Sequence, residues 1–259
     1  MAIKIKNAKQ IEGIRNASRL AAECLKYLEQ FVVEGVTTKE LDTRAAEFMK
    51  KHNARSATLG YRGHGVQPFS GNICTSPNDV ICHGVPNDYT LKNGDILNID
   101  VTPILDGYFG DTCKMYTVGQ ISEQAQNLID ATKKSLRIGM EQCFPGNRFG
   151  NIGFEIANYA RGEGYSVVYE FCGHGVGLSF HEEPDVPHSA SKNSGKRMQP
   201  GMIFTIEPMI NTGKARSKVD KKDGWTARTI DGGLSAQFEH TILITENGYE
   251  ALTDVFGDF

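Results

Sequence analysis

Hydrophobic positions follow two different spacings along the chain, and each spacing predicts a different kind of element. Between residues 8 and 32, apolar residues recur every three to four positions, which predicts an amphipathic helix. Gly35 interrupts this pattern, and Thr37-x-x-Glu40 then has the form of a capping box that starts a second helix. From about residue 57 to 118, short apolar runs separated by Gly, Pro and Asn predict strands and turns.

The same order of elements then repeats in the second part of the chain. Ser122 is placed to cap a third helix, Pro145 interrupts it, and a fourth helix and further strands follow. The chain is therefore predicted to be an α+β protein with two helix-helix-sheet halves, residues 8–118 and 122–252. We expect one domain over residues 1–259, because no long linker separates the halves, with strand ends of both halves around a central cleft.

Two aspartates interrupt the apolar pattern between residues 96 and 118. Asp100 lies in the middle of an apolar run, and Asp111 lies on the strand that returns after the turn signal Asp106-Gly107. With that turn as the loop, Asp100 is opposite Cys113 and shares a face with Asp111, about 7–8 Å away. An uncompensated buried charge costs roughly several kcal/mol, so a positive group is expected between the two carboxylates.

The second half carries the same anomaly. Glu207 lies in the apolar run GMIFTIEPM, Glu239 lies in the alternating run SAQFEHTILIT, and His174 lies between two glycines. Each of these residues, taken singly, is more often an edge residue, half of an ion pair or a structural histidine. Four carboxylates cannot share a pocket, however, unless cations neutralise them or some stay protonated, and the lysines and arginines lie mostly in polar segments.

A metal centre explains this set of residues better than an ion pair does. One imidazole with four carboxylates suits Mn²⁺, Fe²⁺, Co²⁺ or Zn²⁺. Five protein ligands with bridging carboxylates suit two ions rather than one. Other site types fit less well: HEEPD is not a helical H-E-x-x-H motif, and the sequence contains no G-x-S-x-G or P-loop motif.

Composition excludes several functional classes. The net charge of −3 over 259 residues gives no signal for specific nucleic-acid binding. No apolar run approaches the roughly 18 residues of a membrane span, and the N-terminal segment lacks the apolar core of a signal peptide. The six cysteines show no C-x-x-C spacing and lie in apolar surroundings, so we expect reduced thiols in a cytoplasmic protein.

Several motifs together resemble those of one enzyme family. The stretches ICHGVPN, NIDV, GDT, CGHGVGLSFHEEP, FTIEPM and SAQFEHT resemble the type I methionine aminopeptidases, and the resemblance runs from the first helix to about residue 252. It implies the pita-bread fold, in which two pseudo-symmetric halves surround a central antiparallel sheet and cleft. It also implies metal-dependent removal of the N-terminal methionine from nascent proteins and peptides.

The resemblance assigns roles to individual residues. It implies two divalent ions (Co²⁺, Mn²⁺, Fe²⁺ or Zn²⁺) bound by Asp100, Asp111, His174, Glu207 and Glu239, of which Asp111 and Glu239 bridge the two ions. It gives His83 and His181 catalytic, substrate-contacting roles, and it builds the methionine pocket from Tyr61, Cys74, Phe180 and Trp225. We expect Glu207 also to carry a proton from water to the leaving amine.

Two rival functions belong to the same fold. One is an Xaa-Pro-specific aminopeptidase or dipeptidase, although such chains usually carry an additional N-terminal domain. The other is a non-catalytic pita-bread binding protein, which would have lost metal ligands. All five ligand positions carry competent residues here, which favours an enzyme.

Some features depart from the resembled family or lie outside its motifs. The segment 61–74 is a few residues longer and has His64 where an aromatic residue is more usual, and Leu178-Ser179 replaces a basic residue and a glycine. The basic stretches 191–197 and 214–222 are expected to be solvated loops, with contact to the ribosome surface as the alternative. We otherwise expect a monomer that binds neither membranes nor specific nucleic acids.

Overall fold

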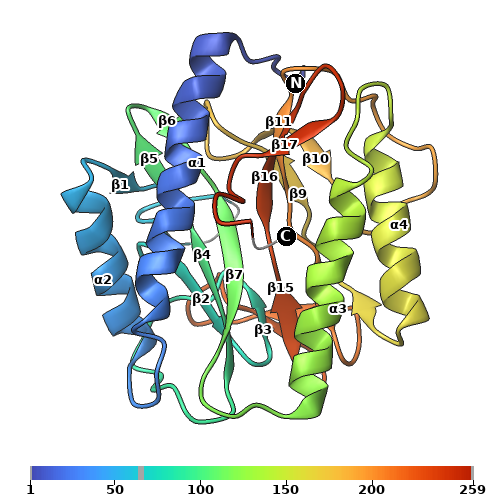
Figure 1. The fold of residues 1–259 in the computed structure, drawn as a ribbon. Coiled ribbons are helices and arrows are strands. Elements are labelled where there is room, and N and C mark those ends of the chain that lie inside the picture. Colours follow the sequence, from blue (N-terminus) through green and yellow to red (C-terminus); the bar gives the residue numbers. More distant parts are fainter. Residues whose placement is uncertain (1, 64–66, 258–259) are drawn as a thin grey trace.

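Each half of the chain packs two helices against antiparallel strands (Figure 1). The computed structural model describes residues 2–63 and 67–257. The helices are α1 (Ala8–Glu29), α2 (Thr38–Lys51), α3 (Glu123–Met140) and α4 (Phe149–Gly162). Helices α1 and α2 lie on one side of the view and α3 and α4 on the other, which confirms the predicted order of elements in the two halves.

The helix starts carry the predicted caps. Thr37 and Glu40 form a reciprocal capping box at the start of α2, and the Ser122 hydroxyl accepts a hydrogen bond from the Ala125 amide at the start of α3. Helix α1 ends at Glu29 rather than at residue 32, because a tighter turn begins there: the Phe31 amide donates to the Leu28 carbonyl.

The strands are short and antiparallel. The first half contains β1 (Arg55–Ser56), β2 (Cys74–Pro77), β3 (Val80–Cys82), β4 (Ile96–Val101), β5 (Pro103–Leu105), β6 (Tyr108–Phe109) and β7 (Thr112–Thr117). The second half contains β8 (Ser166–Val167), β9 (Gly173–Gly175), β10 (Glu182–Val186), β11 (Ile203–Ile206), β12 (Met209–Asn211), β13 (Ser217–Val219), β14 (Ala227–Thr229), β15 (Ser235–Gln237), β16 (His240–Ile244) and β17 (Tyr249–Ala251). Strand β4 lies between β2 and β7, and β16 lies between β11 and β17.

The two halves meet where β7 and β16 lie side by side (Figure 1). The Glu239 amide donates to the Cys113 carbonyl at 3.2 Å, and the Thr112 hydroxyl donates to the Glu239 carbonyl at 2.7 Å. The Thr241 hydroxyl donates to the Asp111 carbonyl at 2.7 Å. Backbone and hydroxyl bonds therefore tie together the chain segments that carry Asp111 and Glu239.

A large apolar cluster lies beneath each pair of helices, and the one beneath α3 and α4 also includes Ile96 and Met115 of the first half. Leu25, Leu41 and Ile99 belong to the core between α1, α2 and the strands of the first half. Phe204 and Ile156 belong to the core beneath α3 and α4. No helix in residues 2–63 and 67–257 combines the length and apolar character needed to cross a membrane.

The register predicted for the first hairpin is confirmed. Leu105 pairs with Tyr108 across β5 and β6, and Asp100 pairs with Cys113 across β4 and β7. Asp106 and Gly107 both have positive φ (51° and 83°), as a type I′ turn requires. The Asp106 side chain is exposed, as expected for a turn residue without a role in the site.

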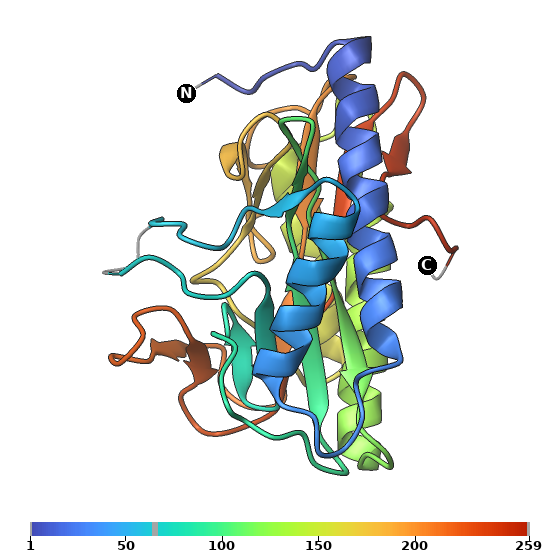
Figure 2. The same cartoon turned by 90° about the vertical axis from the view of Figure 1, so that its left-hand side faces the viewer.

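The two basic stretches differ from each other. Residues 191–197 contain neither helix nor strand and are mostly exposed, as predicted. Residues 214–222 are not a plain loop, because β13 lies within them and pairs with β14 to form a hairpin. This hairpin projects on the side opposite to α1 (Figure 2). His64, which departs from the resembled family, lies outside the described residues.

The turn gives a stability prediction. Gly107→Ala should lower the free energy of unfolding by about 1–2 kcal/mol, because an L-residue is strained at its φ of 83°. Gly248→Ala is the matched control, since Gly248 has no positive φ and no atom within 4 Å of an added Cβ. Urea unfolding monitored by circular dichroism compares the two variants, and equal midpoints would contradict the strain argument.

Candidate metal centre and substrate cleft

Five predicted ligand residues converge at the seam between the halves. Asp100 is on β4 and His174 is on β9, while Asp111, Glu207 and Glu239 lie directly next to the ends of β7, β11 and β16. Single donor atoms of Asp111, His174 and Glu239 all lie within 4.8 Å of one another. His174 Nε2 is 3.6 Å from Asp111 Oδ2 and 3.7 Å from Glu207 Oε1.

Burial makes this group of carboxylates electrostatically costly. Burial raises the pKa of Asp100 to about 7 and the pKa of Glu207 to about 8. Burial, followed by the charges of neighbouring carboxylates, raises the pKa of Asp111 and that of Glu239 well above their usual range. The four residues therefore oppose one another's ionisation unless a cation lies among them.

The donor set fits a divalent metal. Asp100 Oδ1 is buried and has no hydrogen-bond partner among the described residues, so it is available as a ligand. His174 Nδ1 donates to the Gly175 carbonyl at 3.0 Å, which leaves Nε2 unprotonated and directed at the carboxylates. Burial also lowers the pKa of His174 to about 4, so the ring is neutral at physiological pH. Oxygen and imidazole donors in this combination suit Mn²⁺, Fe²⁺, Co²⁺ or Zn²⁺.

A surrounding set of polar side chains, not predicted from the sequence, orients the acids. Thr102 donates to Asp111 Oδ1 and Thr205 donates to Glu207 Oε1, both at 2.7 Å. Gln237 Nε2 donates to Glu207 Oε2 at 3.2 Å. Strand alternation could have indicated Thr205, since it lies two residues before Glu207 and therefore on the same face.

His188 is a further residue of the site that was not predicted. Its Nε2 accepts a hydrogen bond from the Glu207 amide at 3.0 Å, and its side chain is buried. Burial lowers the pKa of His188 to about 3, so the ring is neutral and Nε2 can accept. This contact fixes the backbone at Glu207, directly after β11. No sequence signal marks it, because the bond joins segments that share no periodicity.

The remaining predicted residues lie beside the carboxylates, where the substrate cleft is expected. The Tyr61 ring lies 4.9 Å from Phe180, 5.1 Å from His181 and 6.2 Å from Trp225, measured between ring centroids. His181 is exposed, and its ring is 4.1 Å from that of His174. The aromatic rings therefore adjoin the metal-ligand candidates through His181 and His174.

His83 and Cys74 lie deeper in the same region. The His83 ring lies 6.4 Å from Trp225 and meets Phe171 edge to face at 5.3 Å. Burial lowers the pKa of His83 to about 4, so the imidazole is neutral at physiological pH. Cys74 pairs with Asp100 across β2 and β4, which places it next to the acidic cluster.

A buried ion pair anchors the segment that carries His181. Glu182 lies 2.7 Å from Lys6 Nζ and 2.8 Å from Lys4 Nζ, and the Lys6 side chain is completely buried. Burial opposes ionisation of Glu182, but the hydrogen bonds from both lysines outweigh it and lower the pKa of the carboxyl. The N-terminal segment therefore holds Glu182, the residue directly after His181, in place.

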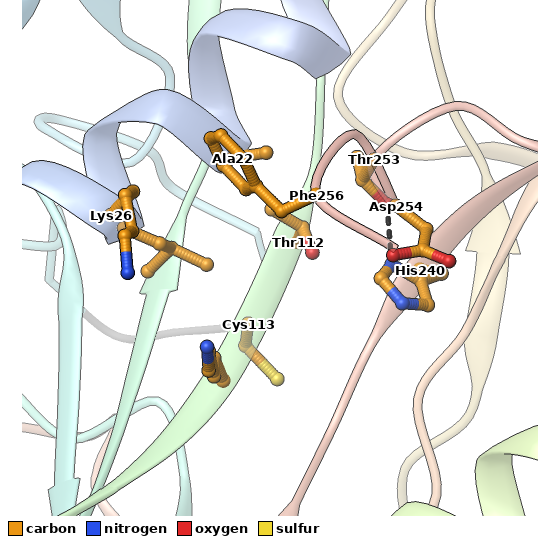
Figure 3. A pocket seen from close by; sticks show the side chains of 10 residues that line it. Ala22, Lys26, Thr112, Cys113, His240, Thr253, Asp254 and Phe256 are labelled. Carbon is orange, nitrogen blue, oxygen red and sulfur yellow. Dashed lines mark hydrogen bonds between the residues drawn. The ribbon is translucent and has the colours of Figure 1, made fainter. Parts of the chain in front are cut away.

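A separate hollow lies beside helix α1 (Figure 3). It is bounded by α1, β7, β16 and the segment around Thr253. In this hollow His240 Nδ1 and the Thr253 hydroxyl are 2.7 Å apart, and the Thr241 amide donates to the same hydroxyl. None of the five ligand candidates lines this hollow.

Known proteins of similar sequence and structure agree with this geometry. Residues 12–246 match the profile of metallopeptidase family M24. A methionine aminopeptidase of Salmonella typhimurium is 49% identical over 255 residues, which cover 98% of this chain and 94% of that protein. Methionine aminopeptidase A of Synechocystis is 48% identical over 252 residues, covering 97% of each chain.

Solved structures give the same picture at the level of the fold. The crystal structure of methionine aminopeptidase from Rickettsia prowazekii superposes with a TM-score of 0.94 at 45% identity, covering 97% of this chain and 100% of that one. A prolidase from Pyrococcus furiosus superposes with a TM-score of 0.75 at 22% identity, covering 96% of this chain and 65% of that one. This similarity shows a shared fold alone.

The fold and the donor set together define a divalent-metal-dependent hydrolase of the pita-bread class. The chain belongs to metallopeptidase family M24.

The raised pKa values predict how pH affects the stability of the metal-free protein. Asp100 has a pKa of about 7 when folded, against roughly 3.9 when unfolded, so stability should fall as pH rises between these values. Asp100→Asn removes this penalty, and its gain in melting temperature over wild type should grow from pH 4.5 to 7.5. A gain of 1 kcal/mol corresponds to roughly 2–4 °C for a chain of this size.

The control for this measurement is Asp106→Asn in the same hairpin, where the side chain is exposed. Chelator-treated samples are melted at each pH, and the control should follow wild type throughout. Parallel curves for Asp100→Asn and wild type would contradict the electrostatic interpretation.

Proposed function

We propose that this protein is a methionyl aminopeptidase that removes the N-terminal methionine from nascent proteins and peptides. The observation that carries the proposal is the convergence of Asp111, His174 and Glu239 donor atoms within 4.8 Å, next to an aromatic cleft. Nearly full-length identity of 48–49% to methionine aminopeptidases supports the substrate. Divalent metal dependence follows from membership of the family.

The metal centre would contain two ions, held by Asp100, Asp111, His174, Glu207 and Glu239, with Asp111 and Glu239 shared between them. Five protein donors with two bridging carboxylates support two ions rather than one. The identity of the ions is one of Co²⁺, Mn²⁺, Fe²⁺ or Zn²⁺, which share this donor preference. When bound, the ions supply Lewis acidity and lower the pKa of water so that hydroxide forms near neutral pH.

The chain's own residues would perform the proton transfer and orient the substrate. Glu207, whose carboxylate is held by Thr205 and Gln237, would take a proton from water and return it to the leaving amine. His181, exposed at the cleft, would stabilise the oxyanion of the tetrahedral intermediate. His83, beside Trp225, would orient the scissile amide.

The aromatic cleft supplies specificity for the first side chain. The rings of Tyr61, Phe180 and Trp225 form its walls. The Tyr61 centroid is 4.9 Å from that of Phe180 and 6.2 Å from that of Trp225, and Cys74 lies nearby on β2. An apolar pocket of this kind accepts an unbranched thioether and disfavours charged side chains. Because both halves contribute ligands, we also propose that residues 1–259 act as one catalytic domain.

The rival functions receive less support. An Xaa-Pro peptidase shares the fold, but the prolidase from Pyrococcus furiosus is only 22% identical, whereas the methionine aminopeptidase of Salmonella typhimurium is more than twice as similar. A non-catalytic binding protein would not need to keep four mutually repelling carboxylates in a buried cluster.

Peptide hydrolysis tests the proposal. We expect release of methionine from Met-Ala-Ser, with much slower cleavage of a Leu-led peptide and of an Xaa-Pro peptide. Chelation should abolish the activity, and Co²⁺, Mn²⁺, Fe²⁺ or Zn²⁺ should restore it to different extents. Asp100→Ala and Glu239→Ala should each reduce activity by more than the roughly 10–100-fold typical of residues that only surround a metal site.

Asp106→Ala is the control for these substitutions, because this exposed aspartate lies in the same hairpin. Activity that survived both chelation and ligand substitution would refute the metal mechanism. Preferential cleavage of the Xaa-Pro peptide would instead favour the rival peptidase.

We further propose that the protein acts as a cytoplasmic monomer that contacts the ribosome surface. Six free cysteines suit a reducing compartment. The β13–β14 hairpin carries Lys218, Lys221 and Lys222 on exposed positions, away from the helices (Figure 2). Its position is fixed because the Ser217 amide donates to Glu170 Oε2 at 2.6 Å.

Sedimentation with ribosomes at several salt concentrations tests this association. Replacing Lys218, Lys221 and Lys222 with Gln should weaken binding and reduce the salt slope by about one for each phosphate that is no longer neutralised. Replacing Lys50 and Lys51 at the end of α2 should have no effect. Absent or salt-insensitive association would refute the ribosome contact and leave the hairpin as a solvated surface.

A further inference from the structure

Backbone hydrogen bonds join Phe69 to Gly60 and Tyr61, beside the aromatic rings of the proposed pocket. The Phe69 amide donates to the Tyr61 carbonyl and the Gly60 amide donates to the Phe69 carbonyl, both at 2.8 Å. These two bonds hold the backbone of Phe69 next to that of Gly60 and Tyr61. The residue that carries the Tyr61 ring is therefore fixed beside Phe69.

Gln67 and Phe69 contact the indole of Trp225, and Gly63 lies close to it. The Trp225 Nε1 group donates to the Gln67 carbonyl at 2.7 Å. The Phe69 ring meets the indole edge to face, with centroids 5.5 Å apart and planes at 87°. A methyl group on Gly63 would lie 3.2 Å from Trp225 Cη2 and 2.6 Å from Tyr61 Cε1, so only a glycine leaves room for both rings.

Phe69 differs in burial from the rings it supports. Its side chain is only 3% exposed, whereas Tyr61 and Trp225 are partly open to solvent. A buried ring packed against the partly exposed Trp225 ring contributes rigidity rather than contact with a ligand. An indole that is fixed on several sides also loses little conformational freedom when a ligand binds.

We propose that Gly63 and Phe69 are specificity-determining residues, which act by fixing Trp225 as a wall of the substrate pocket. This inference rests on the proposed function, because it assigns the pocket to the first side chain of the substrate. Phe69 is a positioning residue, since it reaches the substrate only through Trp225. A fixed wall limits the width of the pocket and thereby discriminates between side chains of similar hydrophobicity.

The discriminating variant is Phe69→Leu, which keeps an apolar side chain but removes the edge-to-face contact. Its matched control is Phe149→Leu, because Phe149 is also 3% exposed and meets Phe204 edge to face at 4.9 Å, in the core beneath α4. Each variant removes one ring of an edge-to-face pair, so a general decrease in stability should affect both variants alike. We call the arrangement of Gly63, Gln67 and Phe69 around the indole the Trp225 clamp. Gly63→Ala perturbs this clamp from its other side.

Kinetics with Met-led and Leu-led peptides gives the first measurement. For Phe69→Leu, we expect the ratio of kcat/KM values, Met over Leu, to fall roughly tenfold. The fall should come from a higher KM for the Met-led peptide, with kcat within about twofold of wild type. Gly63→Ala should also raise this KM, and Phe149→Leu should leave both the ratio and the KM unchanged.

Intrinsic fluorescence gives a measurement that does not depend on activity. Trp225 is the single tryptophan of the chain, so its emission reports on the clamp alone. Phe69→Leu should shift the emission to longer wavelength, increase quenching by acrylamide and weaken the spectral response to added L-methionine. Phe149→Leu should show the wild-type spectrum.

The outcomes separate the two hypotheses. If wild type shows no preference for Met-led peptides, the proposed function fails, and the fluorescence still decides whether the clamp exists. A Phe69→Leu protein with wild-type emission, wild-type KM and an unchanged Met-over-Leu ratio would overturn the inference. A changed ratio in Phe149→Leu as large as that in Phe69→Leu would also overturn it.

Discussion

The burial of four carboxylates in one cluster, to which their mutual repulsion adds, is the constraint on which the rest of this structure depends. Each acid is held in surroundings that raise its pKa, and the charge of Asp100 adds to the penalty on Asp111 and Glu239. The acids do not move apart, because neighbouring groups hold them: Thr102, for example, donates to Asp111. Such a cluster has a high affinity for a cation, since the cation removes the unfavourable interactions that the fold maintains.

This constraint also explains why the site lies between two halves. Asp100 and Asp111 belong to the first half, whereas His174, Glu207 and Glu239 belong to the second. Apolar contacts also cross between the halves, since Ile96 and Met115 of the first half belong to the core beneath α3 and α4. Hydrogen bonds between the segments around β7 and β16 align the two sets, and a bound ion would add a further link between the halves.

Local periodicity made much of this arrangement predictable from the sequence. Strand alternation and the turn after β5 put Asp100 and Asp111 on one face, and the observed pairing agrees. Strand β13 was missed, because a strand of three mostly exposed residues leaves no apolar pattern. Contacts between segments without a shared period could not be predicted either. One example is the hydrogen bond from Trp225 to the Gln67 carbonyl. Every residue has a backbone carbonyl, so the identity of residue 67 does not indicate this bond.

The cleft combines two environments with opposite physical requirements. Its acidic floor must be rigid, because small displacements of like charges change their interaction strongly in a medium of low polarity. Its aromatic wall must admit a side chain and release it, so the rings are partly exposed. His181 lies at the boundary, with its ring 4.1 Å from His174 and 5.1 Å from Tyr61, and its position is therefore sensitive to both parts. The buried pair of Lys6 and Glu182 next to it provides rigidity where neither the acids nor the aromatic rings can.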